Sequence, residues 1–182
     1  MRRRFIALAI WVAAVLVTPG GLCAQAAQVT KEALPGVTNF ARVETTVACA
    51  GATKPEAMAD VKRLGFVSVI NLRLATEEGA DIEAEATAAR AAGLRYVHLP
   101  LNGASPDPSV VDQFLTAVTD PANQPAFIHC ASGNRAAAMW MVKRVQVDRW
   151  DVNKAGEEAA ALGLTSGSLK QFVLDYLHAH PR

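Results

Sequence analysis

Cysteine is scarce in this sequence: 182 residues include only Cys23, Cys49 and Cys130. Small exported domains that lack a sufficient core are usually held by several disulfides, and this count excludes such a framework. The fold must therefore rest on a hydrophobic core, which a chain of this length can bury as one ordinary domain. A thiol kept in such a chain is either paired or used, so Cys49 and Cys130 are candidates for chemistry.

The sequence also lacks a basic block, a metal-binding spacing of histidines and an apolar run long enough to cross a bilayer. The formal net charge is +1, so neither a nucleic-acid nor a membrane-surface partner is expected. The four histidines are scattered, which predicts no metal site, and no cofactor is expected. The apolar run from Phe5 to Val17 is shorter than the roughly 20 residues of a transmembrane helix. We therefore expect no stable membrane insertion once the export signal described below has been cleaved.

The first residues have the layout of an export signal. Three arginines follow the initiator methionine, the apolar run comes next, and Ala-Gln-Ala at 24–26 offers a cleavage site. The sequence therefore predicts a signal peptide at 1–26 and a single domain at 27–182, in a protein that is exported to a periplasm or secreted. An uncleaved membrane anchor and acylation at Cys23 are the alternatives.

Beyond residue 38, short apolar runs rich in β-forming residues alternate with longer helical stretches. The expected strands cover residues 43–48, 66–72, 94–99 and 126–129. One expected helix begins at Pro55 and stops at Gly65, and the others cover residues 81–92, 109–118, 136–145, 152–162 and 168–180. This alternation predicts an α/β fold, a three-layer sandwich with a mainly parallel central sheet flanked by helices. Ligands bind such sheets beyond the carboxyl ends of the strands, where the segment that begins at His129 is expected.

The segment from Cys130 to Arg135 combines the features of an anion site with those of a nucleophile. A strand delivers the thiol at its end, and Gly133 lets the backbone approach a ligand closely. The start of the following helix leaves N–H groups unpaired, and its partial positive charge favours the thiolate. Arg135 adds a planar fork that can hold two oxygens of an anion. A buried inert cysteine and a solvated arginine are the alternatives, but this order of features is more specific than either residue alone.

His129 and Cys130, followed by Gly133 and Arg135, resemble the signature of the cysteine phosphatases of the dual-specificity and tyrosine phosphatase superfamily. In particular, the sequence is similar to a bacterial branch, the beta-lactamase-hydrolase-like phosphatase-like domains. The resemblance extends upstream, through Gly65-Phe66 and Asn71-Leu72-Arg73 to Gly93-Leu94-Arg95-Tyr96. It covers about residues 38–150.

The resemblance implies a cysteine-phosphatase-like fold and the hydrolysis of phosphomonoesters, with phosphotyrosine as one candidate, through a phosphocysteine intermediate on Cys130. Arg135 and the backbone N–H groups of the loop would bind the phosphate, so the expected partner is a phosphorylated substrate or another small oxyanion. The residues that the resemblance assigns to substrate binding surround the nucleophile: His129, Ala131, Ser132, Gly133, Asn134 and Ala136. His129 is expected to support the thiolate, and the alternative is a core histidine at a strand end.

The sequence departs from the superfamily pattern in three places. Four residues separate Cys130 from Arg135, where five are usual. Ala136 stands where a serine or threonine usually helps the thiolate to leave. The general acid is not evident: Asp107 lies in the expected loop, but it equally fits the N-cap of the next helix, and Asp112 is the fallback.

The shorter loop leaves other interpretations open. It also resembles the Cys-x-x-Gly-x-Arg loop of rhodanese-type sulfurtransferases, which would carry a persulfide on Cys130 and need no general acid. A catalytically weak anion-binding module is a further alternative. Cys49 is either a buried spectator or a redox partner that condenses with a sulfenic acid on Cys130. Arg73 either contacts substrate or forms an ion pair with Glu77 or Glu78.

Overall fold

The computed structural model describes residues 29–43 and 45–181. The signal peptide expected at 1–26 lies outside the described residues, and so does Cys23. Within the described part, none of the helices is both long enough and apolar enough to cross a membrane.

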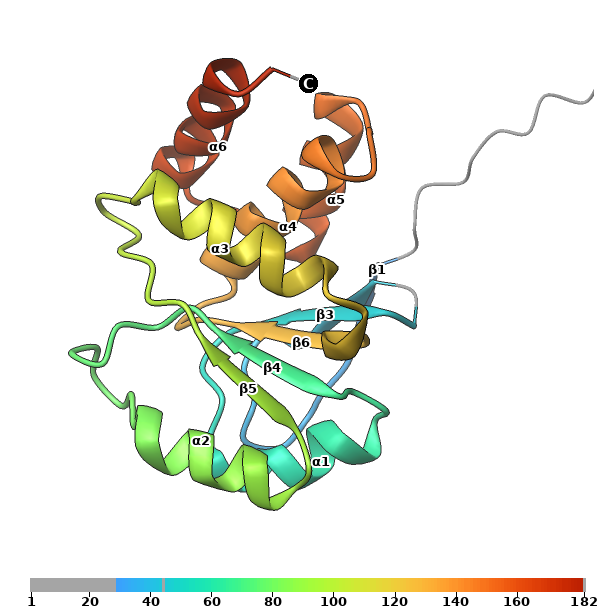
Figure 1. The fold of residues 1–182 in the computed structure, drawn as a ribbon, viewed down its shortest axis with the longest axis vertical. Helices are drawn as coiled ribbons and strands as arrows, with labels where there is room; N and C mark the ends of the chain where they lie inside the picture. Colours follow the sequence, from blue (N-terminus) through green and yellow to red (C-terminus); the bar gives the residue numbers. More distant parts are fainter. Residues whose placement is uncertain (1–28, 44, 182) are drawn as a thin grey trace, which may run out of the picture.

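One mixed sheet runs through the middle of the molecule (Figure 1). Within residues 29–43 and 45–181 its strand order is β1-β2-β3-β6-β4-β5. The strands are β1 (Val29–Lys31), β2 (Ala41–Val43), β3 (Val47–Ala50), β4 (Ser68–Asn71), β5 (Arg95–His98) and β6 (Ala126–His129). β3, β6, β4 and β5 are parallel, whereas β1 and β2 add antiparallel pairs at one edge. The predicted mainly parallel sheet is confirmed.

Helices cover both faces of this sheet. They are α1 (Met58–Arg63), α2 (Ile82–Ala91), α3 (Pro108–Thr119), α4 (Asn134–Gln146), α5 (Val152–Leu162) and α6 (Gly167–Ala179), with short 3₁₀ turns η1 (Pro55–Ala57) and η2 (Pro121–Asn123). Figure 1 shows α1 and α2 on one face and α3, α4, α5 and α6 on the other. The three-layer sandwich predicted from the sequence is confirmed.

The alternation of side chains along β6 separates two cores. Phe127 packs with Phe40 and Phe66 on the α1–α2 face, with ring centroids 6.1 and 5.8 Å from its own. Ile128 and Cys130 belong to the larger core on the α3–α6 face. Because successive residues of a strand point to opposite faces, Cys130 is buried on the side from which α4 begins.

The amino-terminal part of the sheet differs from the expected pattern. Residues 43–48 were expected as one strand, but β2 ends at Val43 and β3 begins at Val47, and the two form an antiparallel pair. The turn between them includes Thr45 and Thr46, β-branched residues that also favour strands, so the composition does not reveal the turn. β1 was not expected, because it has only three residues, of which Val29 is partly buried and the other two are exposed, and so it shows no alternation.

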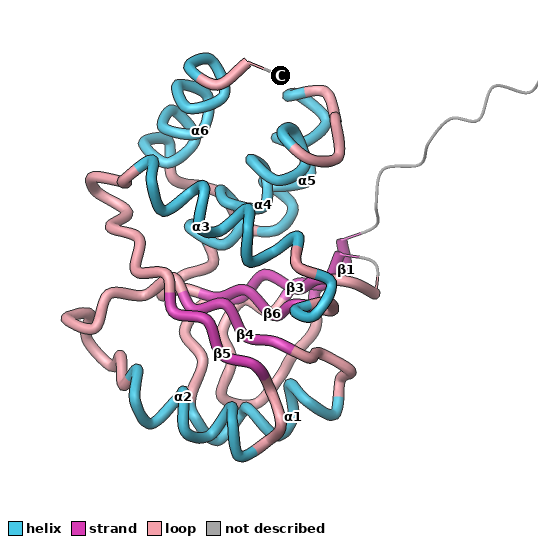
Figure 2. The backbone as a smooth tube through the Cα atoms, in the orientation of Figure 1, coloured by secondary structure: helices cyan, strands magenta, loops and turns pink. Residues whose placement is uncertain are grey.

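The loops that follow the parallel strands meet at one edge of the sheet. Figure 2 shows the connections from β4 to α2, from β5 to α3 and from β6 to α4 emerging at the same side. Carboxyl ends of parallel strands are where open α/β sheets bind ligands. The loop after β6 carries Cys130, so the other two loops are its neighbours.

Candidate active site

Cys130 lies directly beneath the first turn of α4. It is fully buried, and its Sγ accepts a hydrogen bond from the N–H of Gly133 at 3.2 Å. Gly133 is the N-cap residue of α4, with φ of 95° and no side-chain cap, a backbone conformation that glycine adopts without steric cost. The uncapped helix start and its dipole therefore face the sulfur.

The chain between Asn39 and Ala52 holds the loop in place. The N–H of Ala52 donates to the carbonyl of Ala131 at 2.9 Å, and Nδ2 of Asn39 donates to the carbonyl of Ser132 at 2.9 Å. A Cβ atom on Gly51 would lie 3.2 Å from the oxygen of Ala131, so glycine permits this close approach. Two carbonyls of the loop are thus fixed by residues about 80–90 positions upstream.

Asn134 links the loop to the start of α6. Its Oδ1 accepts hydrogen bonds from the N–H groups of Thr165 at 2.7 Å and Ser166 at 2.8 Å. Its Nδ2 donates to Oγ of Ser132 at 3.3 Å. The side chain of Asn134 is therefore used for structure, which leaves its backbone N–H for the predicted contact with an anion.

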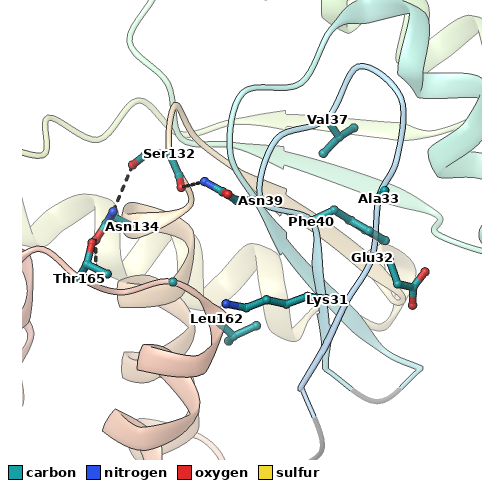
Figure 3. Close-up of a pocket in the computed structure, with 11 residues that line it drawn as sticks. Lys31, Glu32, Ala33, Val37, Asn39, Phe40, Ser132, Asn134, Leu162 and Thr165 are labelled. Carbon is teal, nitrogen blue, oxygen red and sulfur yellow. Dashed lines mark hydrogen bonds between the residues drawn. The ribbon is translucent and has the colours of Figure 1, made fainter.

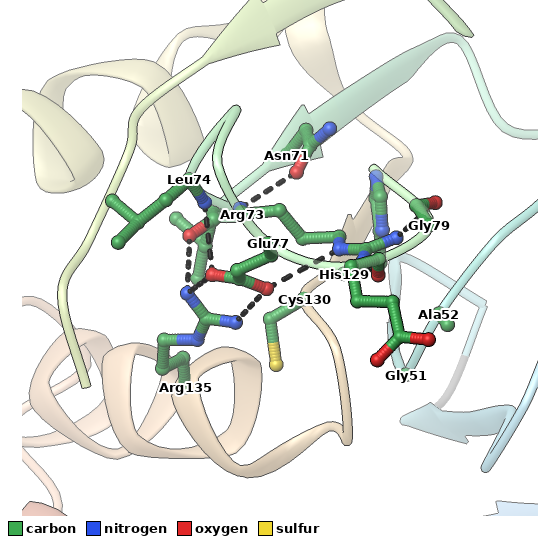
Figure 4. A network of polar contacts seen from close by, with 12 residues as sticks. Gly51, Ala52, Asn71, Arg73, Leu74, Glu77, Gly79, His129, Cys130 and Arg135 are labelled. Atoms are coloured by element: carbon green, nitrogen blue, oxygen red, sulfur yellow. Dashed lines mark hydrogen bonds and ion pairs between the residues drawn. The ribbon is translucent and has the colours of Figure 1, made fainter. Parts of the chain in front are cut away.

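Arg135 is held in a fixed position beside Cys130 by Glu77 (Figure 4). Its Nη1 lies 2.5 Å from Oε1 and its Nη2 lies 2.8 Å from Oε2 of Glu77, a bidentate pair of the strong, charge-assisted kind. Nη1 also donates to the carbonyls of Leu72 at 3.0 Å and Leu101 at 2.8 Å. The guanidinium is thus positioned by the loops that follow β4 and β5.

The ionisation of this pair follows from its surroundings. Burial alone would raise the pKa of Glu77, but the hydrogen bonds from Arg135 and from the N–H of Leu74 outweigh it and lower the pKa to about 2. Burial would lower the pKa of Arg135, but the bonds to Glu77 and the charge of Cys130 raise it. Both Glu77 and Arg135 are therefore charged at neutral pH.

Arg73 braces the short segment that carries Glu77. Its Nη1 donates to the carbonyl of Gly79 at 3.0 Å and its Nη2 to that of Glu78 at 2.6 Å. The expected ion pair with Glu77 is present, with Nε 3.3 Å from Oε2. Sequence reasoning paired these acids with Arg73 and missed the bond from Glu77 to Arg135. The only available signal was that both loops were expected at the same edge of the sheet.

His129 belongs to a buried polar network on the α2 side. Its Nε2 lies 2.6 Å from Oε1 of Glu85, which also accepts from Nδ2 of Asn71 at 3.2 Å. His129 and Glu85 are both almost fully buried. Their contact reaches Cys130 only through the backbone of β6, so a role of His129 toward the thiolate stays a prediction.

Two pockets flank the loop and share Ser132 and Asn134 as their common wall. One has a volume of about 590 Å³ and is lined by Arg73, Glu77, Glu78 and Arg135, together with loop residues. The other has a volume of about 540 Å³ and is lined by segments that include residues 31–33 and 162–165 (Figure 3). The first of these, called the Arg135 pocket below, brings the charged groups together with the loop.

The two candidate aspartates have partners outside this pocket. Asp107 is exposed, and its Oδ1 accepts from the N–H of Ser109 at 2.8 Å as the N-cap of α3. Asp112 accepts from the hydroxyl of Tyr176 at 2.8 Å. Burial and this bond raise the pKa of Tyr176 to about 12. Neither aspartate lines the Arg135 pocket, so a catalytic role for Asp107 stays a prediction.

Cys49 is the other cysteine in the described part of the chain. It is a free, fully buried thiol on β3, and it pairs in register with Ile128. Burial raises the pKa of Cys49, and the charge of Cys130 raises it further. A two-residue offset on adjacent strands places the two Cα atoms roughly 8 Å apart, beyond the usual range of a disulfide. A bond between these cysteines would require the backbone to move.

The fold and the site together define a class of protein. A parallel sheet delivers a buried thiol to the uncapped start of a helix, and an arginine five residues further along the chain is fixed beside it, as in cysteine-phosphatase-like domains. The chain belongs to the family described as "Beta-lactamase hydrolase-like protein, phosphatase-like domain", whose model matches residues 39–147. The resemblance inferred from the sequence is confirmed.

A curated relative is much longer than this chain. A beta-lactamase hydrolase-like protein of Xylella fastidiosa is 31% identical over 129 residues. The match covers 69% of this chain but only 28% of the relative. The activity of that larger protein is therefore no direct guide to this one.

Solved structures agree with the family in fold. TpbA of P. aeruginosa has a TM-score of 0.65 at 20% identity, over 87% of this chain and 92% of its own. The core catalytic domain of the PP-IP phosphatase SIW14 from S. cerevisiae has a TM-score of 0.63 at 20% identity, over 78% of this chain and 87% of its own. At these identities the likeness is one of fold.

Proposed function

We propose that this protein is a cysteine-dependent phosphatase that hydrolyses phosphomonoesters through a phosphocysteine intermediate on Cys130. The observation that carries the proposal is the arrangement around the sulfur. Sγ accepts the N–H of Gly133 at the uncapped start of α4, and Arg135 lies beside it in a bidentate pair with Glu77. A thiolate next to anion-binding donors is suited to attack a phosphoryl group.

In this proposal the protein acts mainly by positioning. The Cys130 thiolate attacks phosphorus, while Arg135 and the backbone N–H groups of residues 131–136 bind the non-bridging oxygens. Charge that develops on those oxygens meets donors that are already in place, so little reorganisation is needed. Water then hydrolyses the phosphocysteine and releases phosphate.

Phosphotyrosine is the substrate that we propose to test first. A solved structure of TpbA holds pTyr, and SIW14 is described as a PP-IP phosphatase, so proteins of this fold act on or bind different phosphorylated groups. The Arg135 pocket, of about 590 Å³, is within the usual size range of small-ligand sites.

A sulfurtransferase is the second candidate, and two features of the loop favour it. Only the four residues Ala131 to Asn134 separate Cys130 from Arg135. The loop is therefore shorter than the usual phosphatase loop and closes more tightly around the sulfur atom. Ala136 has a methyl side chain, so its position supplies no hydroxyl to help a thiolate leave a phosphocysteine. A persulfide on Cys130 would need neither that hydroxyl nor a general acid.

Paired assays separate these functions. The reduced protein is given p-nitrophenyl phosphate in one assay, and thiosulfate with cyanide in the other, and each is repeated with Cys130→Ser. We expect phosphate release that falls at least about 10³-fold in the variant, because serine is a far weaker nucleophile in this setting. Thiocyanate production that depends on Cys130 would support the sulfurtransferase instead. Phosphate binding without either turnover would indicate an anion-binding module.

We also propose that residues 1–26 direct export to a periplasm or to the exterior and are removed, leaving residues 27–182. The proposal rests on the arginines, the apolar run and the Ala-Gln-Ala site of the sequence. The intact mass of the protein recovered from a periplasmic or secreted fraction tests it. A mass that matches the full chain would overturn cleavage at this site.

A further inference from the structure

Hydrolysis of a phosphomonoester with a basic leaving group requires a proton for the leaving oxygen, and the Arg135 pocket contains two carboxyl groups that could supply one. They are Glu77 and Glu78, which are consecutive in the chain and line the pocket together with Ala131 and Arg135. The inference below rests on the proposed phosphatase function and assigns the proton donor of the same site.

Glu77 is unsuited to donate a proton. Both of its carboxylate oxygens face the guanidinium of Arg135, and Oε1 also accepts the N–H of Leu74 at 2.9 Å. These bonds stabilise the anion, so the group carries no proton at neutral pH. Glu77 positions Arg135, and a different group must protonate the leaving oxygen.

In Glu78 the backbone is hydrogen-bonded within the described residues, whereas the side chain, unlike that of Glu77, is not. Its carbonyl accepts a 2.6 Å hydrogen bond from Nη2 of Arg73, and the carbonyl of the next residue, Gly79, accepts from Nη1 at 3.0 Å. The residue is exposed, and its carboxyl group makes no hydrogen bond or ion pair with any residue of 29–43 and 45–181. The backbone is therefore anchored at the pocket while the carboxyl group is left for a ligand.

We propose that Glu78 is the general acid and base of this site, in place of an aspartate from the loop after β5. The aspartates of that region have other partners: Asp107 caps α3 through the N–H of Ser109, and Asp112 accepts from Tyr176. Glu78 comes from the loop after β4 instead. The acid and the residue that positions the arginine are thus neighbours in one segment.

The Cys130 thiolate forms an S–P bond as the P–O bond to the leaving group breaks, and the leaving oxygen takes the proton of the Glu78 carboxyl group. A water molecule then attacks phosphorus and gives its proton to the Glu78 carboxylate, while the S–P bond breaks and its electron pair returns to sulfur. Ester and water become alcohol and phosphate, and both side chains return to their starting states.

The test compares two substrates that differ in their need for a proton. p-Nitrophenolate leaves readily without one, whereas the oxygen of phenol is more basic and needs protonation. We expect Glu78→Gln to lower kcat/KM for phenyl phosphate by about 10²-fold or more, the usual contribution of general acid catalysis, and to lower it much less for p-nitrophenyl phosphate. Glu83→Gln, which removes an exposed carboxylate from α2 outside the pocket, is the matched control and should behave like the wild type on both substrates.

Asp107→Asn is the rival variant in the same experiment. If it shows the selective loss with phenyl phosphate and Glu78→Gln does not, the acid belongs to the loop after β5 and the inference is overturned. Equal losses on both substrates in Glu78→Gln would also overturn it, since that pattern indicates a binding or structural role. A wild-type protein without Cys130-dependent hydrolysis would overturn the proposed function itself, which distinguishes that failure from this one.

Discussion

Two segments approach the Cys130 loop from neighbouring strands, and they differ in how they are bonded. Residues 73–79, after β4, form a network that includes both oxygens of Glu77, three nitrogens of Arg73 and the guanidinium of Arg135. Within the described part of the chain, the side chains of residues 102–107, after β5, form hydrogen bonds only with nearby backbone. Asn102 accepts from Ala104 at 3.0 Å, and Asp107 caps α3.

The difference shows which segment sets the electrostatics of the site. Residues 73–79 bring two carboxylates and an arginine to the pocket, and they fix the direction of the Arg135 fork. The chain after β5 contributes to Arg135 mainly through the carbonyl of Leu101, which accepts at 2.8 Å. Substitutions in the first segment are therefore expected to change catalysis, whereas substitutions in the second are expected to change mainly stability.

Among the variants expected to change both catalysis and stability, Glu77→Gln has the largest effect. Glutamine keeps the shape of the side chain but removes the charge that pairs with Arg135, and it cannot accept two bonds from the fork. We expect kcat/KM to fall by about 10- to 100-fold, since small misplacements of a positioning group are costly. The free energy of unfolding should fall by about 2 kcal/mol, as is typical for hydrogen bonds to charged groups. Steady-state kinetics and urea unfolding measure the two effects, with Glu83→Gln as the control.

The contribution of the Glu77–Arg135 pair to stability should also depend on pH. The folded pKa of Glu77, about 2, lies below its ordinary value of 4.5, so its contribution to stability is complete above pH 4.5 and is lost as the pH falls toward 2. The difference in unfolding free energy between wild type and Glu77→Gln should therefore be constant near neutral pH and shrink below pH 4.5. A difference that stays the same down to pH 3 would mean that the Arg135 pair does not lower this pKa.

Much of the fold could be predicted from the sequence because its signals are local. Residues 152–162 were predicted as a helix and form α5 with the same bounds, since Asp151 caps the start and Gly163, with φ of 113°, ends it. The strand before Cys130 was equally clear as a short apolar run at the expected place. β1 was missed because a three-residue edge strand has too few residues to show a pattern.

The candidate site could be predicted only in part. The thiol, the glycine and the arginine are close in sequence, so their spacing reveals them. The partner of Arg135 lies 58 positions away, in Glu77, and a single sequence gives no measure of such a distance. Gly51 shows no local signal of its role, because its close approach to the carbonyl of Ala131 depends on the register of β3 against β6. These contacts are set by the packing of the sheet rather than by local preference.

Asp107→Ala gives the smallest expected effect and tests residues 102–107, the segment after β5. The Oδ1 of Asp107 accepts the N–H of Ser109 at 2.8 Å at the start of α3, and loss of such a cap costs about 1 kcal/mol. We expect urea unfolding to show this loss, and Asp107→Asn to restore most of it because asparagine also caps helices. The leaving-group dependence of kcat/KM should change far less than in Glu78→Gln. A selective loss with phenyl phosphate in both Asp107 variants would mean that the residue moves into the pocket during turnover, and the contrast between the two segments would then hold only for the free protein.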